Sequence, residues 1–383
     1  MSSYTVTHIN PASKTITRPL TFLNPHYSPP NTNPSTTDAA LETFHRQLPD
    51  YGETPLHSLP SIAAELGFKH VFVKDESTRF GLPSFKILGA SWAIHRAVCK
   101  HLSMPPSTTL TGLQEALAKG TASEVRIVTC TDGNWGRACA RMAKYLRVPV
   151  TVYVPGFMIE STQNLMRSEG AEVKVVANGS YDDAIAAVQH DMQRTGALMV
   201  MDTSWEGYEE VPGWVTEGYK TTLLETDRQL RLATSGLLPT LVIGSVGVGS
   251  WMHAVTTHYS SRSKVATVEP DTAACLKESL HTGRLTSIET GNSIMCGMNC
   301  GTPSTIAWPI LRDGVWAAVA VTDREAHGCV EELEKEGVNA GPCGAATLAA
   351  LRRLCARNKI QGREGGVVVL FSTEGGREYD VPV

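Results

Sequence analysis

The chain alternates between short apolar runs and longer segments in which apolar residues recur at helical spacing. Short β-branched runs are typical of strands buried in a parallel sheet, and the helical period is typical of helices with one packed face. Predicted strands lie at 71–73, 126–128, 150–154, 173–176, 241–243, 265–268, 315–321 and 367–371. Predicted helices lie at 87–100, 136–146, 161–169 and 181–195. Thr322 and Glu325 have the spacing of a capping box that opens a further helix.

Strands and helices that alternate with short connections are typical of doubly wound α/β layers. In such folds ligands bind at the carboxyl ends of the strands, so the loops that follow the predicted strands are the candidate functional segments. Residues 1 to about 40 are rich in Asn, Pro, Ser and Thr and show neither a helical nor an alternating period. We expect them to form an extended arm over the body of the protein.

Length and composition exclude several classes of function. The 383 residues suffice for two domains or one large one, and a formal net charge of −4 leaves no basic excess for nucleic acid or an anionic membrane. No apolar run approaches the roughly 20 residues that cross a bilayer, and the N-terminus lacks the apolar core of a signal peptide. We therefore expect a cytoplasmic protein whose nine cysteines are thiols. No metal-ligand spacing is present, which predicts no metal site, and whether Cys275 and Cys300 meet is left open.

Lys86 lies between Phe85 and Ile87, in an apolar stretch that opens a predicted helix. Burial there would lower the pKa of its amine, because an apolar environment disfavours the charged form. A neutral amine is what Schiff-base chemistry requires. The ordinary alternative is a lysine whose stem covers apolar surface while its amine reaches water.

A glycine-rich loop follows the strand predicted at 241–243 and precedes a predicted helix. It contains Gly247, Val248, Gly249 and Ser250. Glycines let the backbone approach an anion, and a helix N-terminus offers unpaired N–H groups. The loop has neither the dinucleotide fingerprint nor the ending of a P-loop, so it suits one phosphate better than a pyrophosphate. A tight structural turn is the alternative.

Two further loops place polar side chains after predicted strands. The first contains Thr131, Asp132, Gly133, Asn134 and Trp135. The second contains Ser372 and Thr373. Helix caps and turns explain such residues without any function. Together, however, a lysine amine, a single-phosphate cradle, an amide and a hydroxyl pair are the parts needed to hold pyridoxal 5'-phosphate.

The same residues resemble the fold-type II (tryptophan synthase β-like) pyridoxal enzymes, and within them the diaminopropionate ammonia-lyases. The similarity lies in YGETPL at 51–56, RFGLPSFKILG at 79–89, TDGNWGRA at 131–138, DTSWEGY at 202–208, SVGVGS at 245–250, IMCGMNCGTPSTIAWPILRD at 294–313 and STEG at 372–375. The resemblance implies two doubly wound parallel-sheet domains with the cofactor between them. Residues 1–90 and 205–383 would form the larger domain and 91–204 a smaller, mobile one. It also implies a homodimer.

The resemblance implies a role for each candidate residue in cofactor binding. Lys86 would form the Schiff base, and Asn134 would hydrogen-bond the 3'-oxygen of the ring. Ser372, or else Thr373, would face the pyridine nitrogen. The phosphate would be held by the backbone of Gly247, Val248, Gly249 and Ser250.

The implied reaction is α,β-elimination of D- or L-2,3-diaminopropionate to pyruvate and ammonia. Lys86 would move the α-proton on one face and Asp132 on the other, so that the D-enantiomer also reacts. Asp202 would contact the β-amine of the substrate, although a strand-end cap also explains it. The loop residues Thr131, Gly133 and Trp135 would line the substrate site.

Other activities remain open at this stage. Trp135 stands where this family commonly has histidine, which leaves the exact substrate undetermined. The alternatives are another pyridoxal β-elimination enzyme of the serine or threonine dehydratase kind, a β-replacement enzyme of a biosynthetic pathway, and a catalytically inactive member of the fold that only binds its ligand.

Overall fold

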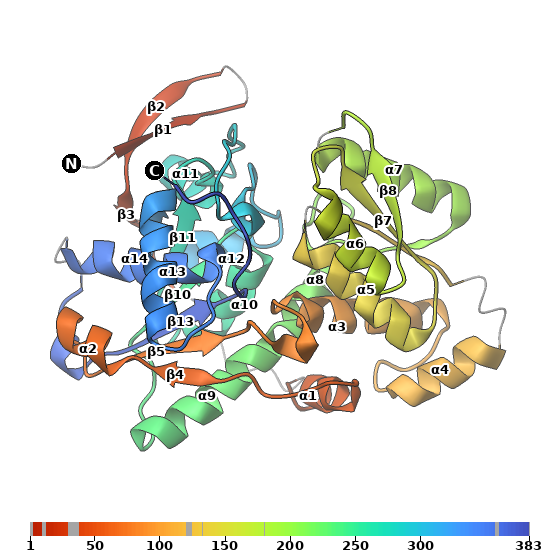
Figure 1. Cartoon of the computed structure of the whole chain (residues 1–383), viewed down its shortest axis with the longest axis horizontal. Helices are drawn as coiled ribbons and strands as arrows, with labels where there is room; N and C mark the ends of the chain where they lie inside the picture. Colours follow the sequence, from red (N-terminus) through yellow and green to blue (C-terminus); the bar gives the residue numbers. More distant parts are fainter. Residues whose placement is uncertain are drawn as a thin grey trace.

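The computed structural model describes residues 3–9, 13–29, 38–119, 125–131, 133–179, 181–356 and 360–382. Figure 1 shows two α/β bodies side by side, each built around its own sheet. A seven-stranded sheet has the order β3-β12-β11-β10-β13-β5-β4, and a four-stranded sheet has the order β8-β7-β6-β9. The predicted α/β class with parallel sheets is therefore confirmed.

The larger sheet forms one hydrophobic centre of the protein. Its strands are β3 (Thr21–Leu23), β4 (Leu56–Ser58), β5 (His70–Asp75), β10 (Leu241–Ser245), β11 (Lys264–Pro270), β12 (Ala317–Val321) and β13 (Val367–Ser372). The inner strands pair in parallel, whereas β3 and β4 pair antiparallel at the two edges. Every residue of β10, β12 and β13 is buried, as expected of strands covered on both faces.

The smaller sheet consists of β6 (Ile127–Cys130), β7 (Val150–Pro155), β8 (Glu172–Val176) and β9 (Leu198–Met199), all parallel. The strand predicted at 173–176 is present as β8, but the prediction that it is buried was wrong, because no residue of β8 is fully buried. It lies at the edge of the sheet, where one side of the strand has no neighbour in the described sheet. A run of β-branched residues does not reveal whether a strand is central or at an edge.

Helices cover both sheets and join them (Figure 1). Around the larger sheet lie α1 (Asp38–Gln47), α2 (Pro60–Leu66), α9 (Lys220–Thr234), α10 (Ser250–Tyr259), α11 (Cys275–Thr282), α12 (Trp308–Gly314), α13 (Asp323–Lys335) and α14 (Pro342–Ala356). Around the smaller sheet lie α4 (Leu110–Lys119), α5 (Asn134–Leu146), α6 (Glu160–Ser168) and α7 (Tyr181–Thr195). The four predicted helices are confirmed to within two residues, as is the capping box of Thr322 and Glu325.

The helices α3 (Lys86–His101) and α8 (Glu210–Gly218) pack against each other between the two sheets. They meet at two glycines, because a Cβ atom on Gly218 would lie 2.4 Å from the carbonyl oxygen of Leu88 and 2.8 Å from Cα of Gly89. This close crossing places the start of α3, and therefore Lys86, at the junction of the two bodies. The domain boundaries remain a prediction, and α3 runs across the one between 90 and 91.

The N-terminal segment differs from the predicted arm. Strands β1 (Ser3–Thr7) and β2 (Thr15–Pro19) form an antiparallel hairpin, and β3 joins the larger sheet. Tyr4 and Val6 are buried while the residues between and before them are exposed, so a short alternating pattern was overlooked. Arg18 ties the hairpin to α11 by hydrogen bonds of 2.7 and 2.8 Å to Glu278.

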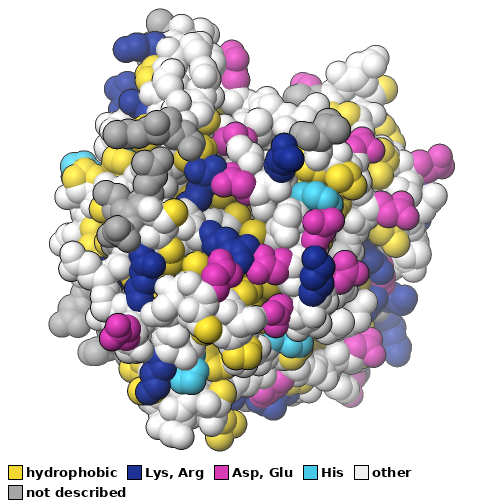
Figure 2. All heavy atoms as spheres, turned by 60° about the vertical axis from the view of Figure 1, so that its left-hand side comes forward, with side chains coloured by type: hydrophobic (Ala, Val, Ile, Leu, Met, Phe, Trp, Pro, Cys, Tyr) yellow, Lys and Arg dark blue, Asp and Glu magenta, His cyan; other side chains and the backbone are white. Residues whose placement is uncertain are grey.

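Figure 2 shows one face of the molecule, on which basic and acidic side chains lie interspersed. In the part of the chain that the structure describes, no helix has the length and apolar composition needed to cross a bilayer. Within the same residues no cluster of His, Cys, Asp and Glu has the arrangement of a metal site.

Candidate active site

Lys86 is the first residue of α3, and its amine points toward the smaller body of the protein. Nζ lies 2.6 Å from Oδ2 of Asp202, which follows β9. The rings of Phe85 and Trp135 lie 5.4 and 5.9 Å from Nζ, so the amine is enclosed by one carboxylate and two aromatic faces. The side chain of Lys86 keeps 21% of its surface exposed, which leaves an opening for a ligand.

The charge of this amine differs from the sequence-based expectation. Burial lowers the pKa of Lys86, as predicted, but the Asp202 carboxylate raises it by more, and the net pKa is above its ordinary value. The amine beside Asp202 is therefore an ammonium ion rather than the predicted neutral amine. The error arose because Asp202 is 116 residues away in sequence, and sequence spacing did not reveal the ion pair.

The glycine-rich loop connects β10 to α10, as predicted. Gly249 has φ of 93°, which favours glycine, and Ser250 is the first residue of the helix. A Cβ atom on Gly247 would lie 2.8 Å from the carbonyl oxygen of Gly297, so only glycine fits there. The first N–H groups of α10 have no acceptor within the helix and face the end of the strand. This is the geometry of an anion site.

The segment after β6 leads into α5. Oγ1 of Thr131 accepts a hydrogen bond of 2.9 Å from the Gly133 amide. Asn134 opens α5, and its Nδ2 lies 3.4 Å from Oε2 of Glu374. Trp135 is buried and donates its ring N–H to Oγ1 of Thr129 at 3.0 Å. Asp132, the predicted second acid/base, lies outside the described residues.

The hydroxyl pair lies at the carboxyl end of β13, beside the segment that carries Lys86. Ser372 and Thr373 are both buried. The Phe85 amide donates to the Thr373 carbonyl at 3.3 Å, and Ser84 forms a bridge with Glu374. A Cβ atom on Gly344 would lie 2.3 Å from Oγ of Ser372, so the start of α14 approaches the hydroxyl closely.

Direct contacts join these loops into one site. The Ser304 amide donates to the Val248 carbonyl of the glycine loop at 2.7 Å, and the Ser304 hydroxyl lies 2.6 Å from that of Ser204, two residues after Asp202. The Phe85 ring lies 4.9 Å from Trp251 at the start of α10. All the described candidate segments therefore converge at the junction of the two bodies.

Comparison with known proteins identifies the family. The model of the pyridoxal-phosphate dependent enzymes matches residues 48–373. The diaminopropionate ammonia-lyase of Salmonella typhimurium is 33% identical over 362 residues, which are 88% of this chain and 89% of the relative. The chain belongs to the diaminopropionate ammonia-lyase family of pyridoxal-phosphate dependent enzymes. The Escherichia coli diaminopropionate ammonia-lyase is 31% identical, covering 87% of this chain and 86% of that one.

Solved structures of the Escherichia coli diaminopropionate ammonia-lyase have the same fold. The complex with D-serine superposes with a TM-score of 0.84 at 27% identity, covering 98% of this chain and 95% of that chain. The complex with an aminoacrylate–pyridoxal phosphate azomethine reaction intermediate superposes with a TM-score of 0.83 at 28% identity, covering 93% of each chain.

The site of this family member fits pyridoxal phosphate. An accessible amine, a helix N-terminus preceded by a glycine-rich loop, and buried hydroxyls at a strand end lie within one junction. Cys275 and Cys300 are not joined by a disulfide bond, and both lie beside Gly247. They therefore border the anion site.

Glu374 is a site residue that the sequence reasoning missed. Its carboxylate is buried and accepts hydrogen bonds from the Cys343 amide at 3.2 Å and from Asn134 Nδ2 at 3.4 Å. It therefore links the start of α14 in the larger body to the start of α5 in the smaller one. The available signal was its position directly after Ser372 and Thr373 at a strand end.

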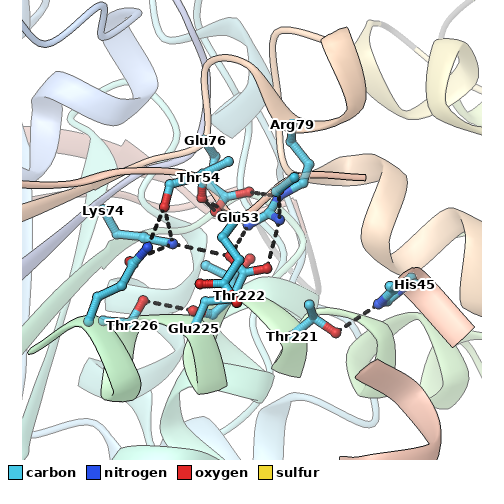
Figure 3. A network of polar contacts seen from close by, with 12 residues as sticks. His45, Glu53, Thr54, Lys74, Glu76, Arg79, Thr221, Thr222, Glu225 and Thr226 are labelled. Carbon is cyan, nitrogen blue, oxygen red and sulfur yellow. Dashed lines mark hydrogen bonds and ion pairs between the residues drawn. The ribbon is translucent and has the colours of Figure 1, made fainter. Parts of the chain in front are cut away.

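A buried network of charges holds the segment that leads to Lys86 (Figure 3). Arg79 donates to Glu225 of α9 at 2.6 and 2.9 Å and to Glu76 at 2.8 Å. Lys74 of β5 lies 3.1 Å from the same Glu225 carboxylate. All four side chains are almost fully inaccessible to solvent. Arg79 lies in one of the motifs that carry the family resemblance, yet sequence alone did not predict its pairing with Glu225.

Proposed function

We propose that this protein binds pyridoxal 5'-phosphate through Lys86 and eliminates the β-amino group of 2,3-diaminopropionate, producing pyruvate and ammonia. The observation that carries the proposal is the Lys86 amine, 2.6 Å from Asp202 and at the meeting point of the predicted cofactor loops. When bound, the cofactor supplies an electron sink for the charge left at the α-carbon. The names and ligands of the relatives support the choice of substrate.

Different residues of this chain would bind the different parts of the cofactor. Asn134 would orient the cofactor ring through its amide, and Ser372 or Thr373 would present a neutral hydroxyl to the ring nitrogen. The backbone of Gly247, Val248, Gly249 and Ser250 would hold the phosphate. We also propose that the protein is a homodimer, on the basis of the family resemblance, and that it is cytoplasmic, as expected from its sequence.

Lys86 and Asp202 would handle protons on one face of the substrate. Nζ of Lys86 would remove the α-proton, for which it must first lose its own extra proton. The Asp202 carboxylate is the nearest described acceptor, at 2.6 Å. Once it holds that proton, Asp202 would pass it to the β-amino group of the substrate as that group leaves as ammonia, so the proton moves from Lys86 to the leaving group. Asp202 would therefore both protonate the leaving group and adjust the charge of Lys86.

Trp135 stands where the family resemblance implies histidine, and its contacts indicate a different role. Its only ring N–H is already donated to Thr129, so it has no proton to exchange with the substrate. Its ring instead faces Nζ of Lys86. We infer that Trp135 shapes the pocket and that proton transfer on the second face depends on Asp132 alone.

Asp132→Asn tests this assignment of the second face. We expect the variant to lose activity on D-2,3-diaminopropionate by roughly 10²- to 10⁴-fold, because the amide cannot accept a proton, while the L-enantiomer reacts with little change. Initial rates of pyruvate formation from each enantiomer measure the effect. Equal losses on both enantiomers would contradict the assignment.

The activity assay also separates the alternatives. Pyruvate formed from diaminopropionate in preference to serine, with or without an added thiol nucleophile, is the expected result. A product that incorporates the nucleophile would identify a β-replacement enzyme. Stronger activity on serine or threonine would identify a dehydratase.

A further inference from the structure

Tyr219 packs against the face of α3 that carries Lys86. It joins α8 to α9, and its ring lies 4.7 Å from Phe85 and 5.9 Å from Trp251. A Cβ atom on Gly89 would lie 2.5 Å from Cε1 of this ring. Gly89 is three residues after Lys86 and so lies on nearly the same side of the helix. The phenol therefore occupies the space between the first turn of α3 and the first turn of α10.

The hydroxyl of Tyr219 is buried without a hydrogen-bond partner among the described residues. A buried tyrosine hydroxyl normally has a partner, because an unsatisfied one destabilises the fold. The phenol lies close enough to Lys86, Asp202 and Ser250 for their charges and hydroxyl to act on it, although its own hydroxyl forms no hydrogen bond within the described residues. The ring packs in the hydrophobic core, and the unsatisfied hydroxyl lies near these site residues.

Two observations indicate which kind of group the Tyr219 hydroxyl binds. Burial raises the pKa of Tyr219 above its ordinary value, so the phenol stays protonated and can donate. The Lys86 amine already has a partner in Asp202, whereas the first N–H groups of α10 form an anion site beside Ser250. A neutral donor next to such a site is suited to a phosphate oxygen.

We propose that the Tyr219 hydroxyl donates a hydrogen bond to the phosphate group of the cofactor at the N-terminus of α10. This side chain would add to the backbone donors of the glycine loop, and glycine at position 89 leaves the space that its ring occupies. The proposal rests on the proposed function only for the placement of the phosphate.

Tyr219→Phe tests the proposal through binding and without turnover. The dissociation constants of pyridoxal 5'-phosphate and of pyridoxal, which lacks only the phosphate, are measured by equilibrium dialysis. Because a hydrogen bond to a charged group is lost, we expect pyridoxal 5'-phosphate to bind about tenfold or more weakly, with the affinity for pyridoxal unchanged. Tyr259→Phe is the matched control, since Tyr259 is equally buried in α10 but donates to Asp227 at 3.0 Å.

The outcomes are distinct. A loss confined to pyridoxal 5'-phosphate in Tyr219→Phe, with none in Tyr259→Phe, supports the proposal. An equal loss of affinity for both ligands would show that the hydroxyl acts on Lys86 or on the cofactor ring. No loss of affinity would show that the hydroxyl does not contribute to binding. Either result overturns the proposal. Wild-type protein that binds both ligands equally would refute the phosphate placement itself, while the proposed elimination is judged separately from pyruvate formation.

Discussion

Lys86→Ala is expected to reduce elimination by roughly 10⁴-fold or more, because the variant has neither the amine that anchors the cofactor nor the base that removes the α-proton. The side chain that contacts the Lys86 amine is the carboxylate of Asp202, which cannot form a Schiff base in its place. Pyruvate formation measures the rate, and the visible absorption of added pyridoxal phosphate reports whether the Schiff base forms.

Two further variants identify the cause of this loss. Lys86→Arg keeps a positive charge near Asp202 but cannot form the Schiff base under the assay conditions, so it should be as inactive as Lys86→Ala. Lys100→Ala removes another lysine of α3, whose exposed side chain pairs with Glu210 on the surface, and should leave the rate unchanged. An active Lys86→Arg variant would contradict the assignment of Lys86 as the anchor.

Arg79→Met is expected to lower the free energy of unfolding by about 3–5 kcal/mol, because it removes one partner from a buried charge network. In the native protein Lys74 and Arg79 balance Glu76 and Glu225, all almost fully inaccessible. Methionine fills similar space but leaves Lys74 facing both carboxylates. Arg228→Met, on the exposed side of α9 where Arg228 pairs with Glu42 and Glu53, should cost less than about 1 kcal/mol. Chemical denaturation of both variants gives the comparison.

The pH dependence of this effect has a definite sign. Burial raises the pKa of Glu225, but the charge and hydrogen bonds of Arg79 lower it by more, to about 2. A carboxylate with a depressed pKa stabilises the fold above its ordinary pKa, and that contribution is lost as the pH falls. In Arg79→Met the same carboxylate should protonate more readily. The difference in unfolding free energy between wild type and variant should therefore shrink as the pH falls from about 4.5 toward 2, and a constant difference would contradict the charge argument.

The sequence was sufficient where the signal is local. Period and composition predicted the parallel strands and the helices at 87–100 and 136–146, and the spacing of Thr322 and Glu325 predicted their capping box. The sequence did not predict contacts between residues that are distant in the chain. Asp202 reverses the predicted charge state of Lys86. Glu225 pairs with Arg79 and Lys74, which lie 146 and 151 residues earlier in the chain.

The edge position of β8 was missed for a related reason, because the packing of the whole sheet decides which strands become neighbours. The N-terminal hairpin did carry a local signal, but its alternating pattern is short and was overlooked. Glu374 and Tyr219 were missed because a single Glu or Tyr carries no pattern. Their importance lies in burial and in what surrounds them.

The stoichiometry of the reaction tests the proposed elimination most directly. Purified protein supplied with pyridoxal phosphate is given D- or L-2,3-diaminopropionate, and pyruvate and ammonia are both quantified. We expect pyruvate to form and both nitrogens of the substrate to appear as ammonia, with Lys86→Ala producing neither. Absence of pyruvate with both enantiomers, in protein that binds the cofactor, would contradict the proposed elimination.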